Sequence, residues 1–431
     1  MKSDKKYSKI VELLHPLAIQ HSPEGTMPNS VIEQWLHALA TDSDLFAKRE
    51  IKNAKELKKE VINILKSNKL YGKESDFFEL IYSDLKLKPT QKARFRFIDL
   101  FAGIGGIRLG AQVNNGVCVF SSEFDSFAQK TYCLNHAETP FGDITKISEN
   151  DIPEHDVLLA GFPCQPFSYA GKTQGFEDKR GTLFFDVLRI LEAKKPKVAL
   201  LENVKGFKSH DKGNTMHIAL SALNEAGYNT YWTILNSYHF GVPQFRERWY
   251  CVAIRSDIDN GKFRFPIGNA PKTTLRDIVD LDLEDPALTL PKFELDRIAY
   301  HFENYHLTER VQHDNSMYAP NTKKGKYGVF SFLKADGSLR FHVGDFAKTQ
   351  IQEAFYACLD TYAPTIIANR VPKLWDIKRK LSIKEAARLQ GFPDEFQFNV
   401  SNAQAFKQLG NSVTVTVIDE IVKEILNVLG E

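Results

Sequence analysis

The feature that most constrains the fold is a run of short apolar segments that alternate with helix-like segments between Phe97 and Arg255. The strand candidates are FIDLF, CVFSSEFD, HDVLLAGFP, KVALLENV and WYCVAIRS. The helix candidates between them are IRLGAQV, SFAQKTYCLNH, TLFFDVLRILEAKK and TMHIALSALNEAG. Strands that alternate with helices are typical of a mostly parallel sheet covered by helices. We therefore expect an α/β fold for the largest part of the chain.

Residues 1–93 precede this alternation and have a helical, charge-rich pattern. In REIKNAKELKKEVINILKSN, the residues Ala54, Leu57, Val61 and Leu65 recur at three- and four-residue spacing, which predicts the buried face of an amphipathic helix. We expect an α-helical N-terminal extension that packs on the rest of the chain. An arm that binds DNA or a partner protein is the alternative, and the segment has no diagnostic residues for it.

The alternation ends after Arg255. Residues 270–380 mix short β-like pieces with loops rich in Lys, Arg, Tyr and Asn; an amphipathic helix is expected at Leu381–Pro393, and Asn411–Leu429 is apolar. We divide the chain into the extension at 1–93, an α/β domain at 94–269 that is completed by 396–431, and a smaller, irregular β-rich domain at 270–395.

The composition is that of an ordinary folded protein. Hydrophobic residues make up 43% and charged residues 26% of the 431 positions, and the net charge is only +2. These fractions exclude wholesale disorder and fibrous classes, and the charge alone does not indicate a nucleic-acid binder. No run approaches the roughly 18 apolar residues of a membrane span, and the N-terminus lacks a signal-peptide core. We therefore expect a protein of the cytoplasm with no membrane partner.

Five cysteines are scattered along the chain without a CxxC pair. An odd number at such spacing does not make a disulfide framework, and the pattern gives no reason to expect zinc or another metal. Most lone cysteines are inert core residues, and we expect this of Cys118, Cys133, Cys251 and Cys358.

A glycine-rich turn follows the first predicted strand. The strand ends at Asp99-Leu100, and Phe101-Ala-Gly-Ile-Gly-Gly106 then leads into a helix, so that a ligand can approach the backbone closely. Glu123 follows about 20 positions later, where a carboxylate can accept hydrogen bonds from ribose hydroxyls. Gly142-Asp143-Ile144 stands where a third strand is expected to end, beside an adenine. Because the GxGxxG spacing of a dinucleotide site is missing, the pattern favours an adenosyl ligand without phosphates.

Cys164 lies in LLAGFPCQPFS, where a predicted strand ends in a turn braced by prolines. Such a turn places the thiol at the carboxyl edge of the sheet, where ligand sites of α/β proteins form. Glu202 ends the next strand and brings a carboxyl group to the same edge; a strand-end cap is its plainer role. We expect a mobile basic flap after the cysteine, on the evidence of Gly171, Lys172, Gly175, Lys179, Arg180 and Gly181.

A thiol, a carboxyl group and an adenosyl donor together suit the methylation of an electron-poor ring carbon. C5 of cytosine is too weak a nucleophile to take a methyl group directly, but addition of a thiolate at C6 makes C5 reactive. Proton donation to N3 by a carboxyl group assists that addition, because it neutralises charge that develops in the ring.

These motifs closely resemble those of the bacterial DNA (cytosine-5) methyltransferases of restriction–modification systems. The matching stretches, in the family's order, are FIDLFAGIGGIRLG, SSEFD, GDIT, DVLLAGFPCQPFSYAG, RGTLFFDVLRIL, LLENVKG, FGVPQFRERWYCVAIR, EAARLQGFP and QLGNSV. The resemblance implies a Rossmann-like catalytic domain that binds S-adenosylmethionine and a target-recognition domain at 270–395. It implies methyl transfer to C5 of a cytosine that is flipped out of a specific short duplex DNA sequence.

Carried over by position, the resemblance makes Cys164 the nucleophile and Glu202 the partner of cytosine N3. It implies that Arg248 binds the cytosine O2. Supporting roles are implied for Pro163, Gln244 and Arg246. The implied S-adenosylmethionine site consists of Phe101, Ala102, Gly103, Ile104, Gly105, Gly106, Glu123, Phe124, Asp143, Ile144, Pro163, Leu183, Asn411, Ser412 and Val413.

The expected macromolecular partner is double-stranded DNA. We expect a monomer that protects host DNA against a cognate restriction endonuclease without binding that endonuclease. No code links the loops of the chain to the DNA sequence that is read. The candidate DNA contacts are Lys172, Arg180, Lys323, Lys324, Lys326, Tyr327, Arg340, Thr365, Asn369 and Arg370.

The sequence departs from the family at Lys384, where arginine is usual and where lysine cannot make a bidentate contact. Three other functions are weighed against the main one. A tRNA cytosine-5 methyltransferase shares the scaffold, but the long segment between the catalytic blocks favours DNA. A catalytically silent DNA-binding regulator has no need of Cys164, Glu202 and Arg248 together. An NAD-dependent oxidoreductase lacks its phosphate-binding spacing.

Overall fold

The computed structural model describes residues 5–41, 43–49, 52–163, 183–305, 309–313, 329–343, 351–367 and 371–430. Within these ranges the largest sheet has six strands in the order β2-β1-β3-β4-β7-β5. The strands are β1 (Phe95–Leu100), β2 (Gly116–Ser122), β3 (Val157–Gly161), β4 (Val198–Val204), β5 (Tyr228–Asn236) and β7 (Glu247–Arg255). β1 to β4 are parallel, and β7 runs antiparallel to both β4 and β5. The predicted α/β fold with a mostly parallel sheet is confirmed.

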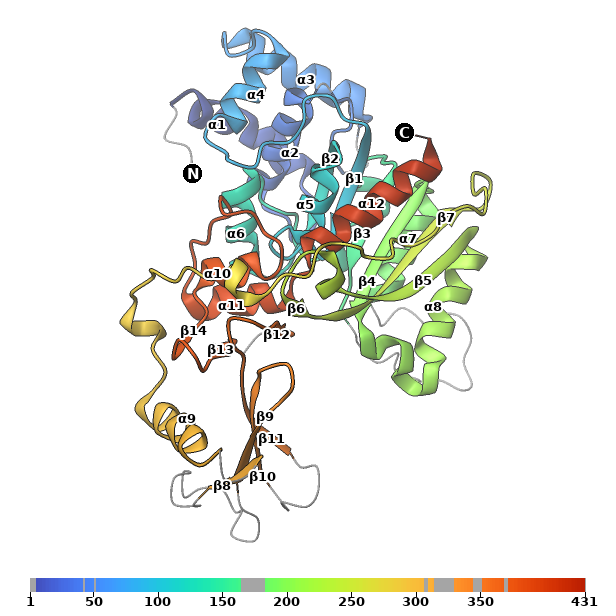
Figure 1. Cartoon of the computed structure of the whole chain (residues 1–431). Coiled ribbons are helices and arrows are strands. Elements are labelled where there is room, and N and C mark those ends of the chain that lie inside the picture. The colour runs from blue at the N-terminus through green and yellow to red at the C-terminus, as the bar shows by residue number, and fades with distance from the viewer. Residues whose placement is uncertain are drawn as a thin grey trace.

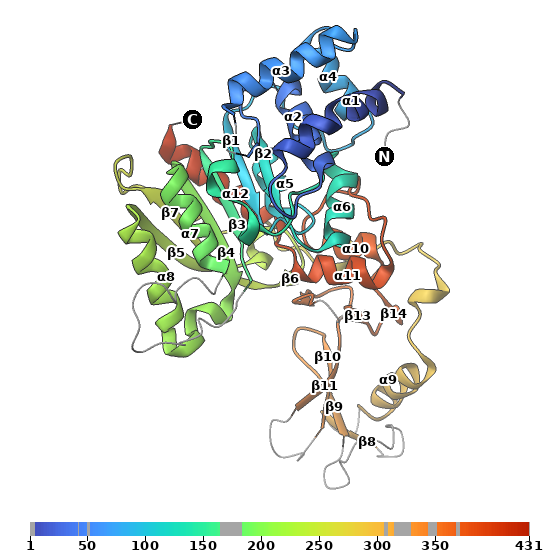
Figure 2. The ribbon, with the colours of Figure 1, turned by 180° about the vertical axis from the view of Figure 1, so that it is seen from behind.

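Helices cover both faces of this sheet, as the near-continuous apolar strands require. Alternate residues of each strand face opposite sides: Phe97 packs in one core with α5 (Gly106–Gln112) and α12 (Val415–Leu429), whereas Ile98 packs in another with α7 (Leu183–Lys194) and α8 (Asn214–Glu225). α12 lies across the face seen in Figure 1, and α7 lies on the face seen in Figure 2. α6 (Ser126–His136) follows β2.

The N-terminal extension is helical, as expected. It consists of α1 (Lys5–His21), α2 (Pro28–Ala40), α3 (Ala54–Ser67) and α4 (Glu74–Tyr82). Leu57, Val61 and Leu65 are fully buried, so the amphipathic pattern identified the correct face of α3. The apolar residues of these helices share one continuous core with Val119 and Phe120 of β2. The extension is therefore packed on the sheet (Figure 1).

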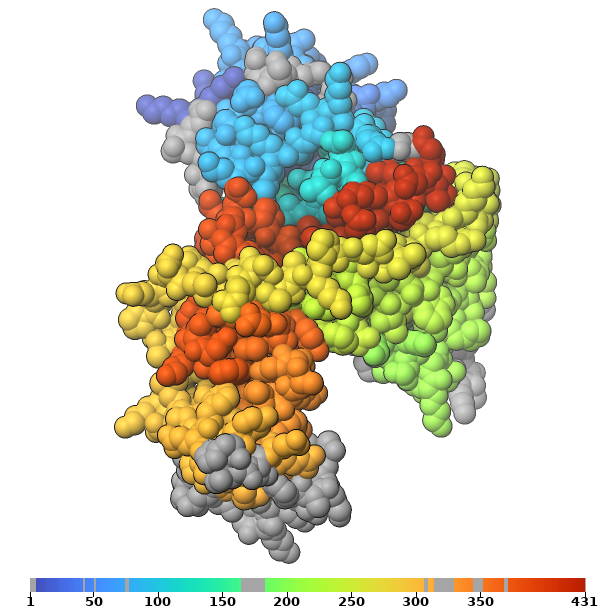
Figure 3. Space-filling view, in the orientation of Figure 1, coloured from blue at the N-terminus to red at the C-terminus, as the bar shows by residue number. Residues whose placement is uncertain are grey.

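A second lobe lies below the large sheet in Figure 1. Its described part contains α9 (Lys292–Asn304) and an antiparallel sheet in the order β11-β10-β9-β8, formed by β8 (Arg310–His313), β9 (Val329–Leu333), β10 (Leu339–Val343) and β11 (Ile351–Tyr356). A short parallel pair joins this lobe to the large one: β12 (Ala363–Pro364) with β6 (Gln244–Phe245). β13 (Lys373–Leu374) and β14 (Arg379–Lys380) form a short antiparallel pair of their own. Figure 3 shows a hollow in the surface between this second lobe and the part of the large lobe that carries β5 and α8.

The predicted third strand before Asp143 is wrong. Phe141 forms a single bridge with Ser122, and the chain then turns into the short 3₁₀ helix Ile144–Lys146. The reason is local, since the Asp143 side chain accepts from the Thr145 amide and caps that turn. The helix expected over Leu381–Pro393 is shorter, with α10 spanning Ile383–Arg388, because Gly391 takes a left-handed conformation with φ of 73°. The apolar stretch at the C-terminus forms the end of α11 (Asn402–Asn411) and α12.

Lys384 lies at the surface and shares Asp394 with Arg388. A two-pronged contact is made instead by Arg379, whose Nη1 and Nη2 donate to the two carboxylate oxygens of the fully buried Glu385 at 2.9 and 2.7 Å. Arg379 thus supplies the bidentate geometry that a lysine cannot.

Candidate active site

Four parallel strands carry the predicted site residues to one edge of the sheet. β1 leads into the glycine-rich turn, β2 ends just before Glu123, β3 ends two residues before Pro163, and β4 contains Glu202. The carboxyl ends of parallel strands meet at a common edge, which is where ligands of open α/β sheets bind.

Glu123 holds the glycine-rich turn. The amide of Gly103 donates to its Oε2 and the amide of Asp125 donates to its Oε1, both at 2.8 Å. Gly103 and Gly105 have φ of 55° and 87°, which favour glycine. A Cβ at Gly105 would lie 2.3 Å from His136 Nε2, whereas a Cβ at Gly103 would meet nothing within 4 Å. The turn is therefore packed against the protein at Gly105 and open at Gly103.

The other predicted cofactor residues gather around this turn to different degrees. Gly106 faces the segment after α11, since a Cβ there would lie 2.5 Å from Ser412 Oγ and 3.1 Å from Val413 Cγ2. Phe124 is 77% exposed beside Glu123. Ile144 is held by Arg189 of α7, whose Nη2 donates to its carbonyl oxygen at 2.6 Å. Ala102 and Ile104 are buried in the turn, Leu183 begins α7, and Asn411 ends α11 exposed.

Glu202 and Arg248 form the charged pair of the site. Arg248 Nε lies 3.2 Å from Glu202 Oε1, and β4 pairs with β7 so that Val204 stands opposite Arg248. Glu202 is only 9% exposed. Burial raises the pKa of Glu202 above its ordinary value, although Arg248 and Arg246 act in the opposite direction. The carboxyl group is therefore disposed to hold a proton and to donate it.

The chain leading to the predicted nucleophile is held beside Glu202. Gly161 pairs with Glu202 across β3 and β4, and a Cβ at Gly161 would lie 3.5 Å from Glu202 Oε2. The buried side chain of Asn203 donates through Nδ2 to the carbonyl oxygen of Phe162 at 3.0 Å. Pro163 follows, exposed. Cys164 itself lies outside the described residues, as do Lys172 and Arg180.

Gln244 and Arg246 point inward and connect segments that are distant in the sequence. Gln244 Nε2 donates to the carbonyl oxygen of Leu389 at 2.9 Å, and its Oε1 accepts from the amide of Ile366 at 2.9 Å. Arg246 donates to the carbonyl oxygens of Ile366, Gly410 and Ser412. Burial, with the neighbouring Arg248, lowers the pKa of Arg246 to about 9. These contacts join the segment that follows β11, the strand that carries Arg248 and the segment at the glycine-rich turn.

Two of the candidate DNA contacts lie in the described part of the chain. Arg340 packs over the Phe355 ring, 3.7 Å from its centroid, and its Nη1 donates to Gln352. The hydroxyl of Thr365 donates to the carbonyl oxygen of Phe245 at 2.8 Å, so Thr365 joins the segment after β11 to the chain just before Arg248. The remaining candidates, Lys323, Lys324, Lys326, Tyr327, Asn369 and Arg370, lie outside the described residues.

Sequence patterns did not single out the role of Asn203, which directly follows Glu202, or of Arg379, which lies six residues before Glu385. Their hydrogen bonds run to partners that only the fold brings close, and no local signal marks them.

The other cysteines match the expected inert core residues. Cys118, Cys251 and Cys358 are buried, and Cys133 is partly buried. Burial raises the pKa of Cys133 to about 11 and raises those of the other three thiols above the ordinary value. Over the described ranges, no cluster of side chains could hold a metal ion, and no helix is long and apolar enough to cross a membrane.

Comparison with known proteins places this geometry in a family. Residues 95–427 match the family model for C-5 cytosine-specific DNA methylase. The chain is 44% identical to the type II methyltransferase M.NlaX of Neisseria lactamica, with 77% of this chain and 96% of that protein aligned. It is 38% identical to the type II methyltransferase M.HhaI of Haemophilus parahaemolyticus, with 78% of this chain and 96% of that protein aligned. M.MspI of Moraxella sp. is 32% identical over 98% of this chain and 91% of its own, so that alignment includes the N-terminal helices.

Solved structures agree in fold. The S. pombe Dnmt2 methyltransferase superposes with a TM-score of 0.54 at 18% identity, covering 78% of this chain and all of that one. A DNA modification methyltransferase of an E. coli prophage superposes with a TM-score of 0.53 at 21% identity, covering 78% of this chain and 99% of that one. The family model spans most of the chain, from the first strand of the sheet to the last helix. The chain belongs to the C-5 cytosine-specific DNA methylase family.

Proposed function

We propose that this chain methylates C5 of a flipped-out cytosine within a specific short sequence of duplex DNA, through a covalent bond between Cys164 Sγ and C6 of the base. The observation that carries the assignment of roles is the buried Glu202 carboxyl group, which is paired with Arg248 and stands beside the Gly161 backbone that leads to Cys164.

The residues at the glycine-rich turn fit S-adenosylmethionine. Each oxygen of Glu123 accepts one backbone amide and keeps a lone pair for a ribose hydroxyl. The Phe124 ring is exposed at the same place, where an adenine could cover it, and the open side of Gly103 admits a ligand close to the backbone. When bound, S-adenosylmethionine supplies an electrophilic methyl group.

The protein groups divide the chemistry between them. The Cys164 thiolate attacks C6, while Glu202 donates a proton to N3 and so neutralises the charge that develops in the ring. Arg248 binds O2 of the same ring and keeps the Glu202 carboxyl group oriented. C5 then has the electron density to accept the methyl group. The C5 proton then passes to water, and the thiolate leaves C6 as the C5–C6 double bond forms again. The N3 proton returns to Glu202, which restores both the ring and the enzyme.

Gln244 and Arg246 support the site by fixing the strand that carries Arg248.

The domains that we propose are the extension at 1–93, the catalytic domain at 94–269 with 396–431, and the target-recognition domain at 270–395. DNA would lie in the hollow between the recognition lobe and the lobe of β5 and α8 (Figure 3). We further propose that the protein acts as a monomer in the cytoplasm and protects DNA against a cognate restriction endonuclease that it does not bind.

Bisulfite sequencing of DNA from a host that expresses the protein tests this proposal. Wild-type protein should leave one short sequence context protected from conversion, with methylation at one cytosine of that context. Cys164→Ser should leave no protected context, because a serine hydroxyl is a far weaker nucleophile than a thiolate. Protection by the serine variant at the wild-type level would overturn the assignment of Cys164.

A further inference from the structure

A buried ion pair stands behind the glycine-rich turn. Arg108 of α5 donates through Nη1 to Glu138 Oε2 at 3.0 Å, and the two residues are only 1% and 2% exposed. Arg108 also donates to the hydroxyl of Tyr132 at 2.9 Å. The hydroxyl of Ser121 donates to the other oxygen of Glu138 at 2.7 Å. Burial alone would raise the pKa of Glu138, but Arg108 and His37 hold it below its ordinary value. Glu138 is therefore a buried carboxylate that depends on its partners.

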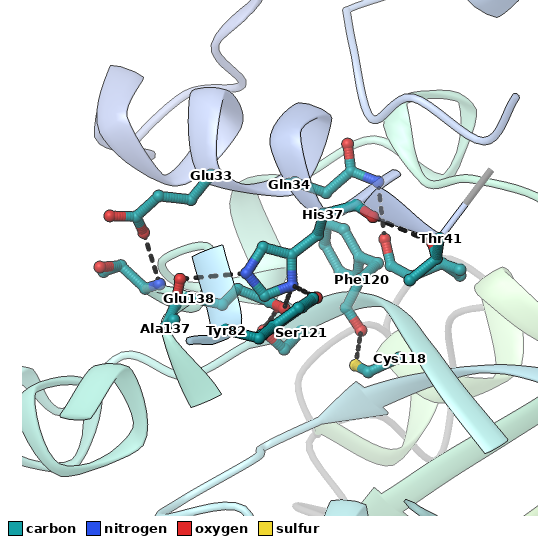
Figure 4. A network of polar contacts seen from close by, with 12 residues as sticks. Glu33, Gln34, His37, Thr41, Tyr82, Cys118, Phe120, Ser121, Ala137 and Glu138 are labelled. Carbon is teal, nitrogen blue, oxygen red and sulfur yellow. Dashed lines mark hydrogen bonds and ion pairs between the residues drawn. The ribbon is translucent and has the colours of Figure 1, made fainter. Parts of the chain in front are cut away.

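The N-terminal helices complete this pair (Figure 4). His37 of α2 presents Nε2 to the carbonyl oxygen of Ala137 at 3.0 Å. Because a carbonyl oxygen can only accept, Nε2 carries a proton, and Nδ1 lies 2.7 Å from the hydroxyl oxygen of Tyr82 in α4. The same Nδ1 lies 3.3 Å from Glu138 Oε2. His37 and Tyr82 are buried, so the extension supplies two polar groups to a site that water does not reach.

The network reaches the proposed cofactor site along two short paths. Arg108 is two residues beyond Gly106, in the helix that the glycine-rich turn begins. Ser121 is two residues before Glu123, on β2. The two paths meet again where Gly103 donates to Glu123. A change in the position of the Arg108–Glu138 pair is therefore transmitted to both the glycine-rich turn and the carboxylate that faces the ribose.

We propose that the N-terminal extension is a positioning element for S-adenosylmethionine, in which His37 and Tyr82 hold the Arg108–Glu138 pair and thereby fix the glycine-rich turn relative to Glu123. This inference rests on the proposed placement of the cofactor at that turn. A buried charged pair that loses a hydrogen-bonding neighbour must shift to find another, because an unpaired polar group in the interior is costly. α5 and β2 would move with it, and the cofactor would meet a less well-formed site.

Gln34 offers a matched control. It lies on the same helix as His37, is equally buried, and bridges to the sheet through Nε2, which donates to the carbonyl oxygens of Leu45 and Val119. Its Oε1 accepts from the amide of Ala47. Gln34 therefore helps to dock the extension without touching Glu138. A role confined to docking would make Gln34 and His37 variants alike.

The test is calorimetric titration of S-adenosylmethionine into the full-length protein, together with thermal unfolding without ligand. Tyr82→Phe removes one oxygen atom and His37→Leu removes both ring nitrogens. Each should raise the Kd for S-adenosylmethionine about tenfold, which is the size of effect expected when one buried hydrogen-bonding group of the network is lost. His37→Gln, which can still donate to Ala137, should recover most of the affinity. Gln34→Leu should lower the unfolding temperature and leave the Kd at the wild-type value.

Hydrogen exchange of the α5 amides gives a second readout, and exchange should be faster in Tyr82→Phe than in Gln34→Leu. An unchanged Kd in both Tyr82→Phe and His37→Leu would overturn the inference, as would an equal rise in Gln34→Leu. Glu123→Gln separates this from the proposed cofactor site. If it binds S-adenosylmethionine as tightly as wild type while Tyr82→Phe does not, the coupling stands and the placement of the ribose at Glu123 is wrong.

Discussion

At the scale of single residues, the proposed chemistry depends on how the protein holds the proton of Glu202. The carboxyl group is nearly buried, and burial acts on its pKa more strongly than the adjacent Arg248 and Arg246. A raised pKa keeps the acid form populated at higher pH than an exposed glutamate allows. Arg248, at 3.2 Å, opposes this shift while it fixes the direction of the carboxyl group. In the proposed mechanism, Glu202 donates the proton and Arg248 orients the carboxyl group that carries it.

We predict that Glu202→Gln lowers kcat by about 10²-fold or more, because an amide cannot donate a proton to N3 as a carboxylic acid does. In wild-type protein, kcat should fall as pH rises through the raised pKa of Glu202, since the acid form is then lost. That descending limb should be absent in the variant. Methyl incorporation measured from acid to alkaline pH checks both points.

Glu247→Gln is the matched control, since Glu247 pairs with Lys205 at 2.8 Å in an exposed position on the neighbouring strand. It should keep the wild-type pH profile. A Glu202→Gln enzyme with wild-type turnover would remove Glu202 from the proton-transfer step.

At the scale of secondary-structure elements, the strand that carries Arg248 is held by its neighbours in the sequence. Gln244 and Arg246 alternate with Arg248 along the chain but turn inward, where they bond to backbone groups 120 or more residues away in the sequence. β6 and β12 pair at the same place. The joint between the lobes is thus formed by polar side chains that meet main-chain carbonyl and amide groups.

We predict that Arg246→Lys destabilises the protein by about 2 kcal/mol, because one ammonium group cannot reach three buried carbonyl oxygens. The melting temperature should fall by roughly 2 °C, because an unfolding entropy of about 2.1 cal/mol/K per residue is large for a chain of this length. Arg264→Lys is the control, because Arg264 also donates to carbonyl oxygens but is exposed. If Arg246→Lys melts with the wild type, the joint does not depend on the guanidinium.

The sequence predicts the elements better than their connections. FIDLF and KVALLENV are continuous apolar runs, so β1 and β4 could be identified from local pattern. β5 was missed, although YNTYWTILN is rich in the aromatic and β-branched residues of strands. The contacts of His37 with Glu138 and of Arg246 with Ser412 could not be predicted, because they join residues far apart in sequence and leave no local pattern.

At the scale of the whole molecule, three parts of the chain lie in three places. The N-terminal helices pack at the end of the sheet remote from β8–β11, the glycine-rich turn and Glu202 lie at the carboxyl edge, and the second lobe faces the hollow (Figures 1 and 3). In the proposed function, cofactor binding and chemistry share the carboxyl edge, whereas DNA reading belongs to the second lobe. Arg246 and Gln244 connect these two parts.

The most direct test of the covalent mechanism uses a short DNA duplex with 5-fluorocytosine at the methylated position. Fluorine cannot leave C5 as a proton does, so the bond between Cys164 and C6 should persist after methyl transfer. We predict a protein–DNA adduct that survives denaturing electrophoresis and needs S-adenosylmethionine for efficient formation. Cys133→Ala should form the adduct as wild type does, and Cys164→Ala should form none. Equal adduct from wild type and Cys164→Ala would contradict the assignment of Cys164 as the nucleophile.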